Sequence, residues 1–322
     1  MINDNRLYYG DNLDVLRLPH IPDESVDLIY LDPPFNSGRN YNQIYADGEG
    51  NSKAQVHAFE DTWDWPGKGN VAALAYDSIV KGGGKLADLL EAIKKIHGAG
   101  SLLAYLSMMA PRLVELRRVL KGTGSIYLHC DPTASHYLKM LMDTVFGMGN
   151  FRNEIVWWYY NKVGAATHTF PSDFDQILTY SKGPRFVFSP QFEDRDTPIK
   201  QLQRVSVGGV LKNKRDAEGN ILYRMSESKK VGAVWRMPCL QHASPERLGY
   251  PTQKPLALLE RIIKASSNPG DTVLDPFCGC GTAIDAAQAL GRKWIGIDIT
   301  HLAIGVIKKR LLDRFGPDVV ST

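Results

Sequence analysis

Residues 272–298, TVLDPFCGCGTAIDAAQALGRKWIGID, contain a strand, a glycine-rich turn, a helix and a second strand, in this order. Gly279 and Gly281 allow the turn to approach a ligand closely, and the helix that begins at Thr282 offers unpaired N–H groups. Asp298 follows 23 residues after Asp275, and an acid at this spacing accepts hydrogen bonds from a ribose diol. This unit predicts a nucleoside site at the edge of a parallel sheet.

A second strand with an acid at its carboxyl end lies near the start of the chain. The apolar run 26–31 is followed by Asp32, Pro33, Pro34 and Phe35. Proline cannot donate to a sheet ladder and restricts the residue before it, so the strand ends here and Asp32 is held stiffly. The sequence therefore predicts a carboxylate, a fixed carbonyl and an aromatic ring at the edge where α/β sheets bind ligands.

The rest of the chain alternates between strand and helix patterns. We expect an α/β fold with a Rossmann-like, doubly wound, mostly parallel sheet. Residues 1–150 and 240–322 would form it, with an irregular excursion at 43–98 and an inserted target-recognition region at 151–239. Further strands are expected at 6–9, 124–130, 154–159 and 176–180, and helices at 12–18, 101–120, 134–146, 256–267 and 301–315.

Composition indicates an ordinary globular protein with one basic region. The 322 residues are 43% hydrophobic and carry a net charge of +3. Residues 195–236 include ten Lys or Arg and four Asp or Glu, which gives this segment a charge of +6. The four cysteines form no disulfide-scaffold pattern, and Cys278 and Cys280 have no second close pair, so we expect no metal. No signal-peptide core or membrane-length apolar run occurs, so we expect a cytoplasmic protein without membrane contact.

Three motifs in one order resemble a known family. Asp32-Pro33-Pro34-Phe35 is similar to the catalytic motif of DNA amino-methyltransferases. The segment 275–282 resembles their S-adenosylmethionine motif, and Tyr250-Pro-Thr252-Gln-Lys254-Pro255 resembles the segment before it. The catalytic motif precedes the cofactor motif, which is the permuted order of the β class. Cys280 stands where the family often has serine.

The resemblance implies an enzyme that moves a methyl group from S-adenosyl-L-methionine to an exocyclic amino group in DNA. Acceptors for both amine hydrogens would localise the nitrogen lone pair, with Asp32 and the Pro33 carbonyl as acceptors and Phe35 stacked on the base. Adenine N6 is favoured by the phenylalanine of the motif, and cytosine N4 is the alternative. The predicted cofactor-binding residues are Asp11, Thr252, Lys254, Asp275, Phe277, Gly279, Gly281, Thr282 and Asp298.

Two of these assignments have structural alternatives. Asp11 is equally well explained as a helix N-cap. Lys254 would hold the methionine carboxylate, or its segment would only cap the following helix.

The expected substrate is double-stranded DNA, from which the target base must be flipped out. The candidate DNA contacts are Arg39, Asn40, Tyr41, Lys212, Lys214, Arg215, Lys229 and Lys230. The resemblance leaves open a homodimer and a cognate endonuclease, and a bacterial, archaeal or phage origin. More remote alternatives are a non-catalytic DNA-binding subunit and a nicotinamide-dependent oxidoreductase.

Overall fold

A computed structural model describes residues 4–34, 40–44, 55–60, 65, 71–162, 164, 166–250 and 252–319. The chain divides into two compact units. Unit 1 comprises residues 1–188 and 233–322, and unit 2 comprises residues 189–232. No helix among the described residues is long and apolar enough to span a bilayer.

Unit 1 contains an eight-stranded sheet in the order β1-β14-β13-β2-β5-β7-β6-β12. Every pairing in it is parallel except those of β7, which runs antiparallel to β5 and β6. The predicted α/β class with a mostly parallel, doubly wound sheet is confirmed. The strands are β1 (Arg6–Tyr9), β2 (Val26–Leu31), β5 (Leu120–Cys130), β6 (Phe151–Trp158), β7 (Phe174–Ser181), β12 (Val234–Arg236), β13 (Thr272–Asp275) and β14 (Lys293–Asp298).

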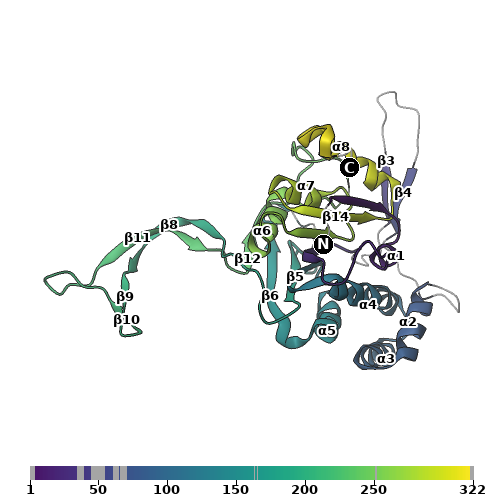
Figure 1. The fold of residues 1–322 in the computed structure, drawn as a ribbon, viewed down its shortest axis with the longest axis horizontal. Helices are drawn as coiled ribbons and strands as arrows, with labels where there is room; N and C mark the ends of the chain where they lie inside the picture. The colour runs from purple at the N-terminus through teal and green to yellow at the C-terminus, as the bar shows by residue number, and fades with distance from the viewer. Residues whose placement is uncertain are drawn as a thin grey trace. The chain divides into compact units, whose positions relative to one another are not determined.

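Helices cover both faces of this sheet (Figure 1). On one face lie α1 (Asn12–Leu16), α4 (Ser101–Val119) and α5 (Ser135–Phe146), and on the other α6 (Leu256–Ser266), α7 (Thr282–Ala289) and α8 (His301–Phe315). The core on the α4 side contains Leu106, Leu113 and Leu138, packed with Ile29 and Ile126 of the sheet. Because both faces are covered, β2 is an almost continuous buried apolar run rather than an alternating one.

The topology places a switch point between β2 and β13. From β13 the chain continues through α7 to β14 on one side, and from β2 it continues through α4 to β5 on the other. Ligands of open α/β sheets bind beyond the carboxyl ends of the strands at such a point. Asp32 directly follows β2, and Asp275 ends β13, so both flank it.

The prediction of an irregular excursion at 43–98 is wrong over its second half. Residues there form α2 (Val71–Gly82) and α3 (Lys85–His97), joined at Gly83 and Gly84. Leu90 and Ile93 of α3 are buried at helical spacing, so tertiary packing stabilises this helix. The neighbouring glycines are typical of a loop, and for this reason the helix was not predicted. The remaining described elements of the excursion are β3 (Asn40–Ile44) and β4 (Gln55–Glu60), which pair antiparallel.

The helix predicted at 101–120 extends over 101–119, and β5 begins at once at Leu120. Gly122 therefore lies inside the strand.

Unit 2 consists of two antiparallel strand pairs with little buried surface. The strand β8 (Phe192–Leu202) pairs with β11 (Tyr223–Lys230), and β9 (Arg204–Val207) pairs with β10 (Val210–Asn213). Residues 151–188, the first part of the predicted recognition region, belong instead to unit 1, where they supply β6 and β7.

Candidate active site

Asp32 lies at the carboxyl end of β2 and is largely buried, with 16% of its side chain exposed. Its Oδ2 forms an ion pair with Nζ of Lys254. Its Oδ1 is buried and has no hydrogen-bond partner among the described residues. A buried carboxylate oxygen in this state is an acceptor available to a donor from outside the protein.

The glycine-rich turn after β13 is tightly packed. Asp275 is buried, and its Oδ1 accepts a hydrogen bond from the Phe277 amide at 3.1 Å. Burial raises the pKa of Asp275 well above its usual range, and the nearby charges of Asp32 and Asp298 raise it further. Gly281 has φ +77°, and a Cβ at this position would lie 2.7 Å from Cγ1 of Ile307. The turn thus needs glycine because of both its backbone angle and its contact with α8.

Asp298 ends β14 beside this turn. Its Oδ2 accepts a hydrogen bond from the Gly279 amide at 2.9 Å, and its Oδ1 accepts from the Thr300 amide at 2.9 Å and hydroxyl at 2.8 Å. Burial raises its pKa. These bonds fix the carboxylate against the turn that precedes α7.

Asp11 is the N-cap of α1 and accepts a hydrogen bond from the Leu13 amide at 2.7 Å. Both of its oxygens also accept from Nη2 of Arg112, at 2.9 and 2.6 Å. Nε of Arg112 donates to Asn12 at 2.6 Å, and Asn12 in turn donates to the Pro276 carbonyl at 2.8 Å. The structural role considered for Asp11 is therefore present, and its predicted cofactor contact stays a prediction. No sequence pattern indicated Arg112, because Asp11 and Asn12 lie about 100 residues before it in the chain.

Lys254 extends from the segment before α6 to Asp32, 222 residues earlier in the chain. Its side chain is 8% exposed. Thr252, two residues before it, has φ +63°, in the left-handed region. The role predicted for Lys254, at the methionine carboxylate, remains a prediction.

A buried polar chain beside Asp32 was not identified from the sequence. The Tyr30 hydroxyl and Nδ1 of His129 are 2.9 Å apart, and Nε2 of His129 lies 3.0 Å from Oδ2 of Asp175. The Tyr159 hydroxyl donates to Oδ1 of Asp175 at 3.3 Å. Burial opposes ionisation of Asp175, but its hydrogen bond with His129 and the charges of His129 and Lys254 lower its pKa. Tyr30, His129 and Asp175 lie on three neighbouring strands that are far apart in the sequence. Their hydrogen-bonded network is therefore visible only in the folded sheet.

The candidate DNA contacts are spread over several segments. Phe35 of the catalytic motif and Arg39 lie outside the described residues, and Asn40 and Tyr41 begin β3. The five remaining candidates, Lys212, Lys214, Arg215, Lys229 and Lys230, are all exposed and all belong to unit 2.

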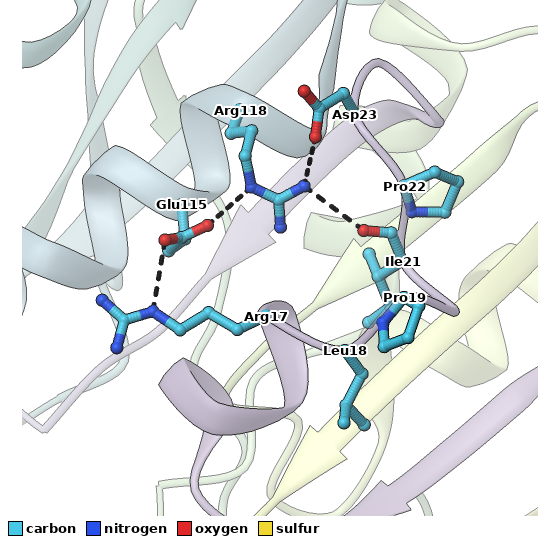
Figure 2. A pocket seen from close by; sticks show the side chains of 8 residues that line it. All are labelled: Arg17, Leu18, Pro19, Ile21, Pro22, Asp23, Glu115 and Arg118. Carbon is cyan, nitrogen blue, oxygen red and sulfur yellow. Dashed lines mark hydrogen bonds and ion pairs between the residues drawn. The ribbon is translucent and has the colours of Figure 1, made fainter.

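A surface hollow of about 480 Å³ lies away from this site, at the amino end of β2 (Figure 2). Its charged groups bind one another: Glu115 accepts from both Arg17 and Arg118, and Arg118 also pairs with Asp23. These contacts tie the loop before β2 to α4. The hollow is therefore explained by structure rather than by ligand binding.

Comparisons with known proteins identify related sequences. The model of the N6_N4_Mtase family, described as DNA methylase, matches residues 26–309. The type II methyltransferase M.EcaI of Enterobacter cloacae is 27% identical over 100% of this chain and 73% of its own length. The DNA adenine methyltransferase YhdJ of Escherichia coli is 30% identical over 95% of this chain and 82% of its own.

Solved structures share the fold. The M1.HpyAVI–SAM complex has a TM-score of 0.51 at 19% identity and covers 95% of this chain and 98% of its own. The cytosine-N4-specific PvuII DNA methyltransferase has a TM-score of 0.56 at 13% identity, with coverages of 99% and 95%.

Proposed function

The chain belongs to the DNA methylase family, as a DNA amino-methyltransferase that uses S-adenosylmethionine, and we propose that its target is the N6 amino group of adenine. The observation that carries the proposal is Asp32, which follows β2 at the switch point of the sheet and whose buried Oδ1 has no described partner. An exocyclic amine supplies the donor that this oxygen lacks. Support for adenine comes from the Asp-Pro-Pro-Phe motif and from the 30% identity to a DNA adenine methyltransferase.

Asp32 and the backbone carbonyl of Pro33 act as the two acceptors in this proposal. The lone pair of an aromatic amine is delocalised into the ring, and hydrogen bonds from both N–H groups draw it back onto the nitrogen. Phe35 would stack on the face of the base and fix its plane. Holding the amine in line with the methyl donor supplies much of the acceleration.

The charges of the site suit the cofactor. When bound, S-adenosylmethionine supplies an electrophilic methyl group on a positively charged sulfur. The carboxyl groups of Asp32 and Asp298 lie close enough to Asp275 to raise its pKa, and a cationic ligand at this edge would stabilise the ionised form of Asp275. Asp298 accepts one described hydrogen bond at Oδ2, so a ribose hydroxyl can share this oxygen. The set of residues proposed to line the cofactor is Asp11, Thr252, Lys254, Asp275, Phe277, Gly279, Gly281, Thr282 and Asp298.

Double-stranded DNA is the proposed substrate, with the target base flipped toward Asp32. We assign phosphate contacts to Arg39, to Asn40 and Tyr41, and to the five basic residues of unit 2. Lys and Arg contacts to phosphate do not depend on the DNA sequence, so other contacts must determine which sequence is recognised. A homodimer and a cognate endonuclease stay predictions.

Nucleoside analysis tests the proposal. Unmethylated DNA is incubated with the protein and S-adenosylmethionine, digested to nucleosides and examined by mass spectrometry. We expect N6-methyladenine, and a loss of at least about 100-fold with Asp32→Asn, while Asp23→Asn on the surface keeps full activity. N4-methylcytosine without N6-methyladenine would refute the adenine assignment.

Cytosine N4 is the second candidate. Its amine is also exocyclic on a flat ring, and two acceptors at the end of β2 serve it equally well. The same mass spectrum decides between the two bases.

A further inference from the structure

The ion pair between Lys254 and Asp32 is buried at the centre of the proposed site. Only 8% and 16% of the two side chains are exposed. Burying two charges is costly, and well-packed apolar residues often serve stability as well or better. A buried pair at a reaction centre therefore calls for a functional explanation.

The pair involves the two oxygens of Asp32 unequally. Lys254 binds Oδ2, whereas Oδ1 is buried without a described partner. A carboxylate free to rotate would present either oxygen. Because Lys254 binds Oδ2, Oδ1 is the oxygen presented at the edge of the sheet.

Several hydrogen bonds hold the segment that carries Lys254. The Gln253 side chain accepts from the Leu248 amide and donates to the Glu246 carbonyl, both at 2.8 Å. The Glu246 carboxylate then accepts from the Leu256 amide, at the start of α6, at 2.6 Å. These bonds hold the backbone on both sides of Lys254, so its direction toward Asp32 is fixed by structure.

We infer that Lys254 is a positioning residue for methyl transfer, which holds Asp32 by Oδ2 and thereby presents Oδ1 to the amino group of the target base. This inference rests on the proposed function of Asp32. It gives Lys254 a role through the catalytic acid, distinct from the cofactor contact predicted from the sequence.

The charge around Asp32 also singles out Lys254. Among the described residues, the charged and titratable groups that interact with Asp32 are Lys254, Asp275, Tyr30 and Cys130. Within this group only Lys254 brings a positive charge, so no other member can replace it as the partner of Oδ2.

Lys254→Met and Lys254→Arg are the test variants, with Lys264→Met as the matched control. Lys264 forms an exposed pair with Glu260 on the neighbouring helix α6. Cofactor affinity is measured by calorimetry, and transfer of tritiated methyl groups to DNA is followed in single turnovers at saturating cofactor. For Lys254→Met we expect cofactor affinity within about threefold of the wild type and a rate about 100-fold lower. Lys254→Arg should recover part of the rate, and Lys264→Met should match the wild type.

Two results would overturn the inference. Cofactor affinity more than tenfold weaker, with a normal rate at saturation, would place Lys254 at the cofactor. An unchanged rate would show that the pair does not act in the reaction. If Lys254→Met does not fold, Lys254→Gln keeps a donor without the charge and is judged by the same criteria. The tritium assay detects methyl transfer to either base. Failure of the adenine assignment is therefore recognised separately, by mass spectrometry of the nucleosides.

Discussion

Replacing Gly281 by alanine tests whether the cofactor turn depends on its contact with α8. The left-handed φ of +77° costs an alanine about 1–2 kcal/mol. The new Cβ would also lie 2.7 Å from Cγ1 of Ile307, and overpacking of this kind costs about 1–3 kcal/mol. We therefore expect Gly281→Ala to lower the free energy of unfolding by about 2–5 kcal/mol.

Gly270 provides the matched control, because its φ is +86° and a Cβ there meets nothing within 4 Å. Gly270→Ala should carry only the backbone cost, about 1–2 kcal/mol. Urea unfolding followed by tryptophan fluorescence measures both variants. All six tryptophans lie outside residues 189–232, so the signal reports on unit 1.

The contact itself is isolated by a double-mutant cycle with Ile307→Ala. Ile307 is fully buried, so this truncation alone costs about 2–5 kcal/mol. In the Gly281→Ala background it should cost about 1–3 kcal/mol less, because it removes the clashing atoms. Equal costs for Gly281→Ala and Gly270→Ala, or strict additivity in the cycle, would refute the steric argument.

Three further predictions concern pH, a buried cation and the surface. Since burial raises the folded-state pKa of Asp275, the folded protein holds a proton that the unfolded chain releases above about pH 4, so stability falls as pH rises. Asp275→Asn should make the urea midpoint less dependent on pH, and an unchanged slope would contradict this. Arg112→Met should cost about 2–3 kcal/mol in urea unfolding, because it leaves Asp11 without its bidentate partner, and a neutral effect would argue against the pair. The Arg236 guanidinium lies 4.3 Å from the Tyr160 ring centroid, on an exposed surface, so Arg236→Ala should weaken DNA binding and lower the salt slope by about one. Anisotropy titrations at several salt concentrations measure this, with the exposed Arg117→Ala on α4 as control; equal salt slopes for the two variants would count against it.

The sequence predicted the strand ends that carry the site, because local rules determine them. Pro33 ends β2 and leaves Asp32 at its carboxyl edge, and the turn glycines end β13 after Asp275. Parallel pairing then brings these ends to one edge. Such inferences need only periodicity and turn chemistry within a few residues.

Contacts between distant segments could not be predicted in this way. Lys254 and Asp32 are separated by 222 residues, and nothing in either local pattern specifies the other as a partner. The helices α2 and α3 were missed for a related reason. Their glycine junction indicates a loop, whereas burial of Leu90 and Ile93 against the rest of unit 1 stabilises helix.

The permuted motif order has a simple physical basis in the sheet. Asp32 directly follows β2 and Asp275 ends β13, and these two strands are adjacent although they are far apart in the chain. Side-chain geometry depends on strand adjacency and register, and Leu274 pairs with Ile29 whichever strand comes first in sequence. The long connection from β2 to β13 can then carry additional structure, including unit 2, without disturbing the pairing. The Lys254–Asp32 pair links the segment before α6 to the end of β2 at the edge of this sheet. Removing the pair therefore tests whether these two parts of the chain cooperate in the reaction itself or only in folding.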